Sequence, residues 1–141
     1  MKNVTKVLLL LSIIAIGFSS CSKEKRIEKH LYSKSGKWNN TLYDYKYYED
    51  GALQSSFAYV DAGYIEFEKG GTYSWTFIQD GDATVEAGTW SNTEDMITLI
   101  SNSIALQFKI LEESKTDMKI EYTEIDGSSK EVYTLTLEKD K

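Results

Sequence analysis

The sequence predicts an all-β domain built as an antiparallel up-and-down barrel of eight strands, with a two-sheet β-sandwich as the alternative. Apolar and polar residues alternate with a period of two in successive short segments, which is typical of strands with one buried face. Turn residues separate these segments, and the chain has no proline and 13% aromatic residues. A meander of such strands loses its exposed edges when it closes, which favours the barrel, although alternation alone does not separate the two architectures.

Eight segments fit the strand pattern, and no convincing helix lies among them. In chain order the segments are 38–48, 65–67, 73–77, 85–91, 96–100, 104–110, 118–122 and 133–137. Turns are expected at 69–71, 80–82 and 126–127, because glycine and aspartate tolerate positive φ.

The first of these segments changes parity along its length. Trp38 and Leu42 fall on one face and Tyr43, Tyr45 and Tyr47 on the other, so a bulge or strong bend is expected. The tyrosines, with Tyr48, either form an exposed strip for a glycan or protein, or pack across strands with Tyr59 or Tyr64 on the outer face of the sheet. The second interpretation is favoured.

The N-terminal segment predicts export and lipidation. A positive start at residues 1–6 precedes an apolar run at 7–18, which is too short to span a bilayer but fits a signal peptide. With small residues before Cys21, the segment resembles the lipobox of bacterial lipoproteins, which implies cleavage after residue 20 and a lipid on the Cys21 sulfur. An ordinary secretory signal with a free Cys21 thiol is the alternative. Ser22, rather than Asp, follows the cysteine, which in lipoproteins of the enteric type implies the outer membrane.

Charge divides the chain after this signal (1–20) into a tether and a domain. The segment 21–35, with the lipidated cysteine, carries net charge +3, lacks a clean period, and reads as a tether or frayed helix suited to an anionic membrane surface. The segment 36–141 holds 9 basic and 20 acidic residues, for a net charge of −11. A domain this acidic repels phosphate backbones, which excludes nucleic acid as an expected partner.

Three motifs in order resemble the lipocalin-like domains of bacterial lipoproteins. Gly36–Lys37–Trp38 opens the first strand as Gly-x-Trp does in lipocalins. Residues 64–73 match a strand, a glycine turn and an exit through Gly-Thr-Tyr, and Gly88–Thr89–Trp90 leads through a polar turn to 96–99. The resemblance spans roughly residues 36 to 139.

This resemblance implies a lipocalin-like barrel whose closed end is plugged by Trp38 after Gly36. Lipocalins also carry a late arginine that stacks on this tryptophan. The only arginine here is Arg26, in the tether, so Lys139 or Lys130 is the candidate for that place, although lysine lacks the planar group.

Aromatic side chains on the predicted apolar face are the candidate lining of a ligand cavity. An eight-stranded barrel encloses space for side chains or for one small ligand, so these residues either line a cavity or fill the barrel. The candidates are Phe67, Tyr73, Trp75, Phe77, Trp90, Phe108, Tyr122 and Tyr133.

The sequence predicts no enzyme, metal site or cofactor. The single histidine, His30, lies in the tether as an expected solvated residue, so no catalytic triad or histidine–cysteine metal site can be assembled. Glu112 and Glu113 are adjacent, which points them to opposite faces of a strand rather than together into a cavity.

The expected function is therefore that of a lipoprotein of the cell envelope, anchored in the membrane through Cys21, which binds a small hydrophobic or amphipathic molecule in its barrel. The tether is expected to hold the open mouth near the membrane. The alternative is a non-catalytic protein with a filled barrel, which binds a protein or glycan through its outer surface. The ligand and any protein partner are not identified by the sequence.

Overall fold

The computed structural model describes residues 23–141, so the signal segment 1–20 and Cys21 lie outside the described residues. A helical segment at 23–32 precedes nine strands. The strands are β1 (Lys37–Glu49), β2 (Ala52–Val60), β3 (Gly63–Phe67), β4 (Thr72–Gln79), β5 (Asp82–Asn92), β6 (Met96–Ser101), β7 (Ile104–Glu113), β8 (Asp117–Asp126) and β9 (Ser129–Lys139).

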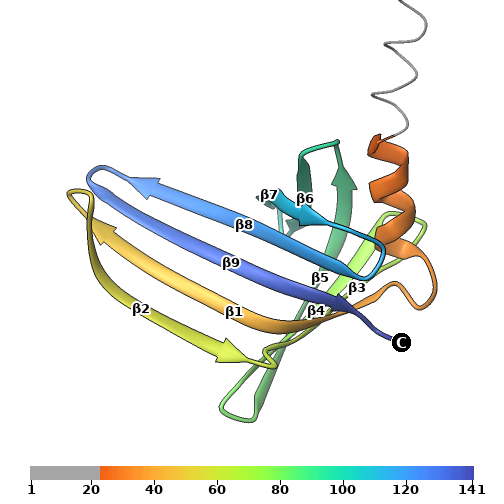
Figure 1. Cartoon of the computed structure of the whole chain (residues 1–141), viewed down its shortest axis with the longest axis horizontal. Coiled ribbons are helices and arrows are strands. Elements are labelled where there is room, and N and C mark those ends of the chain that lie inside the picture. The colour runs from red at the N-terminus through yellow and green to blue at the C-terminus, as the bar shows by residue number, and fades with distance from the viewer. Residues whose placement is uncertain (1–22) are drawn as a thin grey trace, which may run out of the picture.

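Eight of these strands close into an antiparallel barrel (Figure 1). Neighbours follow chain order from β3 to β9, β1 pairs with β3, and β1 also pairs with β9 to close the ring. That seam runs from Trp38 opposite Lys139 to Glu49 opposite Ser129. The predicted eight-stranded up-and-down barrel is confirmed, and the sandwich alternative is wrong because a sandwich would leave this seam open.

The ninth strand, β2, was not predicted, and its environment explains why. It pairs with β1 on the same edge as β3, but farther along, and eight of its nine residues are exposed. A strand without a buried face has no reason to alternate apolar and polar residues, so the period-two signal is missing.

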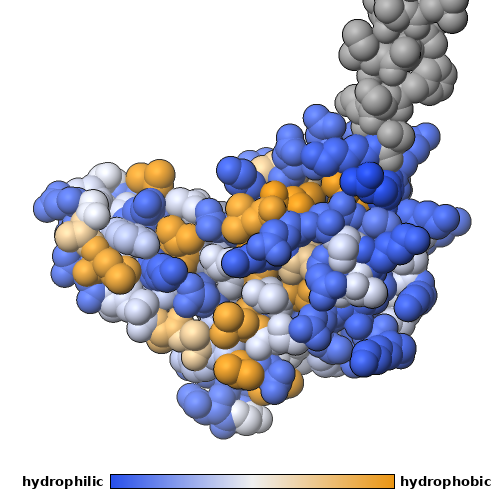
Figure 2. Space-filling view, viewed as in Figure 1, coloured by the Kyte–Doolittle hydropathy of each residue, from blue (hydrophilic) through white to orange (hydrophobic). Residues whose placement is uncertain are grey.

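Together with its neighbours, β2 forms a long curved extension beyond the ring. We call residues 42–60 of β1 and β2, with 122–133 of β8 and β9, the arm; Figure 1 shows it reaching away from the helix. Its tip is held by Glu49, whose carboxylate accepts hydrogen bonds from Ser128, Tyr47 and Ser129, and these bonds lower its pKa to about 2. Figure 2 shows hydrophobic side chains scattered over the arm and between it and the barrel body.

The expected irregularity of the first strand is confirmed. The pairing of β1 with β9 shifts register between Asn40 and Leu42, so Trp38 and Asn40 before the shift face the same side as Tyr43 after it. This bulge turns the first strand so that its tryptophan and its tyrosines can both face the interior.

The ring has two unlike ends. The closed end holds the turns 68–71, 93–95 and 114–116 and the helix, whereas the mouth holds the turns 80–81 and 102–103 and the base of the arm. Fully buried side chains, including Trp38, Phe67, Ile97 and Leu137, form one core cluster.

The segment expected to be a tether is instead a docked helix. Ile27 and Leu31 lie one helical turn apart on the same face, and both are 0% exposed in the core cluster. Trp38 and Lys139 bind the helix from β1 and β9. Of the two interpretations of this segment, a solvated tether or a frayed helix, the helix is the one observed, and it is packed against the barrel. Within the described part of the chain, no helix is long and apolar enough to cross a membrane.

Because the helix belongs to the core, Leu31→Ala should lower the free energy of unfolding of the domain by about 2–5 kcal/mol, through lost burial and the cavity left behind. Lys25→Ala on the exposed face of the same helix is the control and should change it by less than about 0.5 kcal/mol. Urea unfolding followed by circular dichroism gives both values. Equal, small effects would mean that the helix does not contribute to the core.

Candidate functional site

Trp38 plugs the closed end, as the resemblance implied, and the helix supplies its hydrogen-bond acceptor. Its indole Nε1 donates to the backbone oxygen of Leu31 at 3.0 Å. Gly36 precedes it with φ +68°, and a Cβ there would stand 2.1 Å from the backbone oxygen of Phe67. Only glycine permits this close crossing of β1 and β3.

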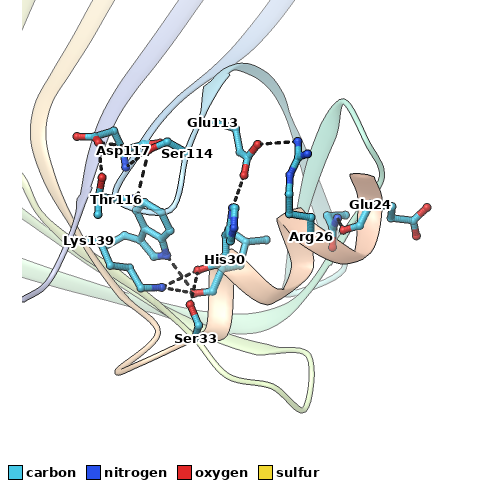
Figure 3. Close-up of polar contacts among 12 residues, drawn as sticks. Glu24, Arg26, His30, Ser33, Glu113, Ser114, Thr116, Asp117 and Lys139 are labelled. Carbon is cyan, nitrogen blue, oxygen red and sulfur yellow. Dashed lines mark hydrogen bonds and ion pairs between the residues drawn. The ribbon is translucent and has the colours of Figure 1, made fainter. Parts of the chain in front are cut away.

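Lys139 occupies the place for which the sequence analysis proposed Lys139 or Lys130. Its amine lies 4.4 Å from the centre of the Trp38 ring and donates to the backbone oxygens of His30, at 2.6 Å, and Leu31, at 3.0 Å (Figure 3). These carbonyls belong to the C-terminal turn of the helix, so together with the Trp38 ring they offset part of the cost of burying the Lys139 charge. Lys130 lies elsewhere, over the ring of Tyr48.

Three of the eight candidate lining residues fill the closed end. Phe67, Tyr73 and Trp90 are at most 8% exposed, and the rings of Phe67 and Trp90 meet edge to face. The Trp90 indole N–H donates to the backbone oxygen of Glu68, and the Tyr73 hydroxyl donates to Glu86 at 2.6 Å. These side chains are packed and hydrogen-bonded as core residues.

Two adjoining hollows lie at the mouth. One cavity of about 410 Å³ is bordered by Tyr43, Trp75, Phe77, Val85, Glu86 and Asn102. A second, of about 140 Å³, is bordered by Tyr43, Trp75, Leu106, Phe108, Tyr122 and Tyr133. Tyr43 and Trp75 belong to both, so the two hollows adjoin, and we call them together the mouth cavity.

Five of the candidate lining residues border this cavity, and one important residue was missed. Trp75, Phe77, Phe108, Tyr122 and Tyr133 lie there, as the alternation along their strands indicated. Tyr43 had been assigned to the outer face. A bulge in this segment was expected. Continuing the alternation beyond the bulge, with one residue skipped, would have placed Tyr43 on the inner face.

The tyrosines of β1 do not form an outer strip. Tyr43 pairs with Tyr59 across strands, as favoured, but both lie on the inner side, where Tyr43 also contacts Phe77 with ring centres 5.0 Å apart. Tyr45 stacks on Phe57 at 4.5 Å and continues this aromatic surface from the mouth onto the arm. The prediction of an outer face was therefore wrong, because the bulge reverses the parity.

The hydroxyl groups at the mouth are neutral donors. Burial, and then the neighbouring tyrosines Tyr45 and Tyr59, raise the pKa of Tyr43 to about 12. Burial and a hydrogen bond to Glu131 raise the pKa of Tyr133 further above its ordinary value. The rim is therefore uncharged at its tyrosines and acidic at Glu86 and Glu131.

His30 is not the solvated residue expected from its place before the domain. Its Nδ1 contacts the carboxylate of Glu113, which Arg26 also binds at 3.3 Å, and the side chains of His30 and Glu113 are 13% and 11% exposed (Figure 3). The helix brings His30 and Arg26 against Glu113 at the end of β7. Both residues had been placed in a tether, where no such contact was expected. Among the described residues, no group of three or more His, Cys, Asp or Glu side chains is arranged to hold a metal ion.

Lys139 should make the free energy of unfolding of the domain depend on pH in the alkaline range. Burial, followed by the charge of Lys34, lowers its pKa from 10.5 to about 8. Between pH 8 and 10.5 the unfolded chain retains a proton that the folded protein has released, so the contribution of Lys139 to the free energy of unfolding rises with pH across this window.

The comparison of wild type with Lys139→Met isolates this contribution, since the variant keeps the apolar stem and loses the titrating group. The stability of wild type relative to the variant should rise from pH 8 to 10.5 in urea unfolding, with the Lys139 side-chain NMR signal titrating near pH 8. A flat difference, or titration near 10.5, would contradict this prediction.

Comparisons with known proteins concern the fold only. No family model and no curated protein sequence matches the chain. A redesigned β-barrel structure is similar with 16% identity and a TM-score of 0.44, over 82% of this chain and 96% of that chain. A deswapped triple mutant of bovine odorant binding protein is similar with 16% identity and a TM-score of 0.41, over 73% of this chain and 71% of that chain.

Proposed function

We propose that the protein is a membrane-anchored binding protein that holds one small amphipathic molecule in its mouth cavity. The carrying observation is a contrast among the three tryptophans. Trp38 and Trp90 at the closed end donate their indole N–H to backbone oxygens, whereas the Trp75 N–H is buried with no partner among the described residues.

This contrast favours a ligand over a filled barrel. A buried indole N–H usually finds an acceptor, because leaving it unpaired costs about 1–3 kcal/mol. The ring of Trp75 borders the mouth cavity, while its Nε1 is buried in the free protein. A bound molecule would supply that acceptor through a turn of the indole toward the cavity, with its apolar part covering the rings of Tyr43 and Phe108. The filled-barrel alternative leaves this arrangement unexplained.

Binding should depend on the indole of Trp75. Native mass spectrometry of residues 22–141, mixed with an extract of the producing cells' envelope, should show a bound species of low mass on wild type and lose it on Trp75→Ala. The control is Met118→Ala, which opens the core at a buried residue that borders neither hollow. If wild type binds nothing, or if both variants lose the species equally, the proposed cavity function is contradicted.

The docked helix changes the expected orientation at the membrane. Cys21 precedes Lys23, where the described helix begins, by two residues, which span at most about 7 Å. A lipid on Cys21 would therefore lie beside the closed end, on which Lys25 and Lys29 add positive charge. The mouth would face away from the membrane, in contrast with the orientation expected from the sequence.

Site-directed labels can test this orientation on lipidated protein in vesicles. A fluorophore at Lys115→Cys, in the exposed β7–β8 turn, should be quenched by spin-labelled lipid headgroups more strongly than one at Asp126→Cys, at the tip of the arm. The reverse order would place the mouth and arm at the membrane instead.

A further inference from the structure

A carboxylate borders the mouth cavity from β5. Glu86 stands opposite Trp75 of β4, so the two side chains lie on the same face of the sheet, and both border the hollow of about 410 Å³. The carboxylate accepts one hydrogen bond from the Tyr73 hydroxyl, at 2.6 Å. An ionised carboxylate accepts several such bonds, so Glu86 keeps acceptor capacity on the side of the cavity.

Three aromatic rings border the same hollow as this carboxylate. Tyr43 and Phe77 contact each other with ring centres 5.0 Å apart and ring planes inclined by 58°, so they form a corner rather than a flat stack. Trp75 adds the third ring. The face of an aromatic ring carries partial negative charge, which attracts a cation held within about 6 Å of the ring centre. Rings and carboxylate therefore favour a ligand of the same charge.

The border of the cavity supplies no positive charge of its own. Among the described residues that border the two hollows, none is lysine, arginine or histidine. Glu86 is exposed, so a cation beside it would keep part of its water, and the cost of desolvating its charge would be small. An anion at the same place would meet Glu86 without a counter-ion.

The inner face of the arm extends this negative charge outward from the mouth. Glu131 lies two residues before Tyr133, which borders the smaller hollow, and its carboxylate accepts from the Tyr133 hydroxyl. Glu124 stands opposite Glu131 on the same face. The two lysines of the arm, Lys46 and Lys130, alternate onto the outer face, because each neighbours an inward residue of its strand. A cation is therefore attracted along the arm toward the mouth, and an anion is repelled.

We propose that the mouth cavity selects a cationic amphiphile, whose ammonium group, primary or quaternary, lies beside Glu86 and against the three rings. This inference rests on the proposed function and specifies the charge of its ligand. The apolar body of the molecule occupies the smaller hollow. The acceptor for the Trp75 N–H belongs to that body, since an ammonium group has none to offer.

The test uses three probes that share a naphthalene ring and an ester oxygen as acceptor: 2-naphthoylcholine, its uncharged carbon isostere 3,3-dimethylbutyl 2-naphthoate, and the anion 2-naphthoyloxyacetate. Binding to residues 22–141 is followed by naphthalene fluorescence. At low salt, wild type should bind the cation about tenfold more tightly than its isostere, which has the same shape, and should bind the anion most weakly. Added salt should weaken binding of the cation and change that of the isostere little.

Two variants assign this preference to the carboxylate and the rings. Glu86→Gln removes the charge but keeps an oxygen that can accept from Tyr73, so the cation should then bind about as weakly as its isostere. Phe77→Leu keeps apolar bulk without the ring and should reduce the preference in part. Glu121→Gln is the matched control and should keep the preference, because it removes the same charge at a residue that borders neither hollow.

The outcomes separate this inference from the proposed function. If wild type binds the cation and its isostere equally, or binds the anion more tightly, the cavity function stands and the cationic ligand is overturned. The same holds if Glu86→Gln keeps the preference, or if Glu121→Gln loses it as fully, since the charge at the mouth would then not be the cause. If wild type binds none of the three probes, the cavity and its charge selectivity fail together.

Discussion

The pairing of β1 with β9 is the constraint on which the rest of the structure depends. It joins the first strand to the last over nearly their whole lengths, from Trp38 to Glu49, and so turns a meander into a ring. The other edge of β1 is divided, with β3 taking its beginning and β2 its continuation. One long strand therefore belongs to the ring at one end and to the arm at the other, which makes the barrel asymmetric along its axis.

The closed end depends on three segments that are distant in the chain. The helix offers the backbone oxygen of Leu31, β1 offers Trp38, and β9 offers Lys139, each of which contacts the other two. None of these groups is satisfied alone, since an indole N–H needs an acceptor and an ammonium group needs compensation when buried. Their mutual contacts close this end of the barrel, and they make the helix part of the domain.

The sequence predicted the strands of the ring, and most of them have one buried face, although β5 is buried only at Trp90. Segments such as 118–122 and 133–137 alternate because their inward residues pack in the core, and the turns at Asp80 and Gly127 adopt the positive φ that their residue types tolerate. The exposed strand β2 carries no such pattern. The docking of the helix was also missed, because two apolar residues one turn apart indicate a buried face only when the surface that covers them is known.

The aromatic inventory alone could not decide between a filled and a hollow barrel, since the same residue types do both here. What decides is the position of each ring along the barrel axis and whether its polar atom is satisfied. At the closed end, Trp90 finds a backbone acceptor from the neighbouring turn, because turns and helix cross over the barrel there. At the mouth the Trp75 N–H finds no such acceptor and stays unpaired among the described residues. The arm extends the aromatic wall of the mouth outward, because Tyr45 stacks on Phe57 beyond Tyr43 and Tyr133.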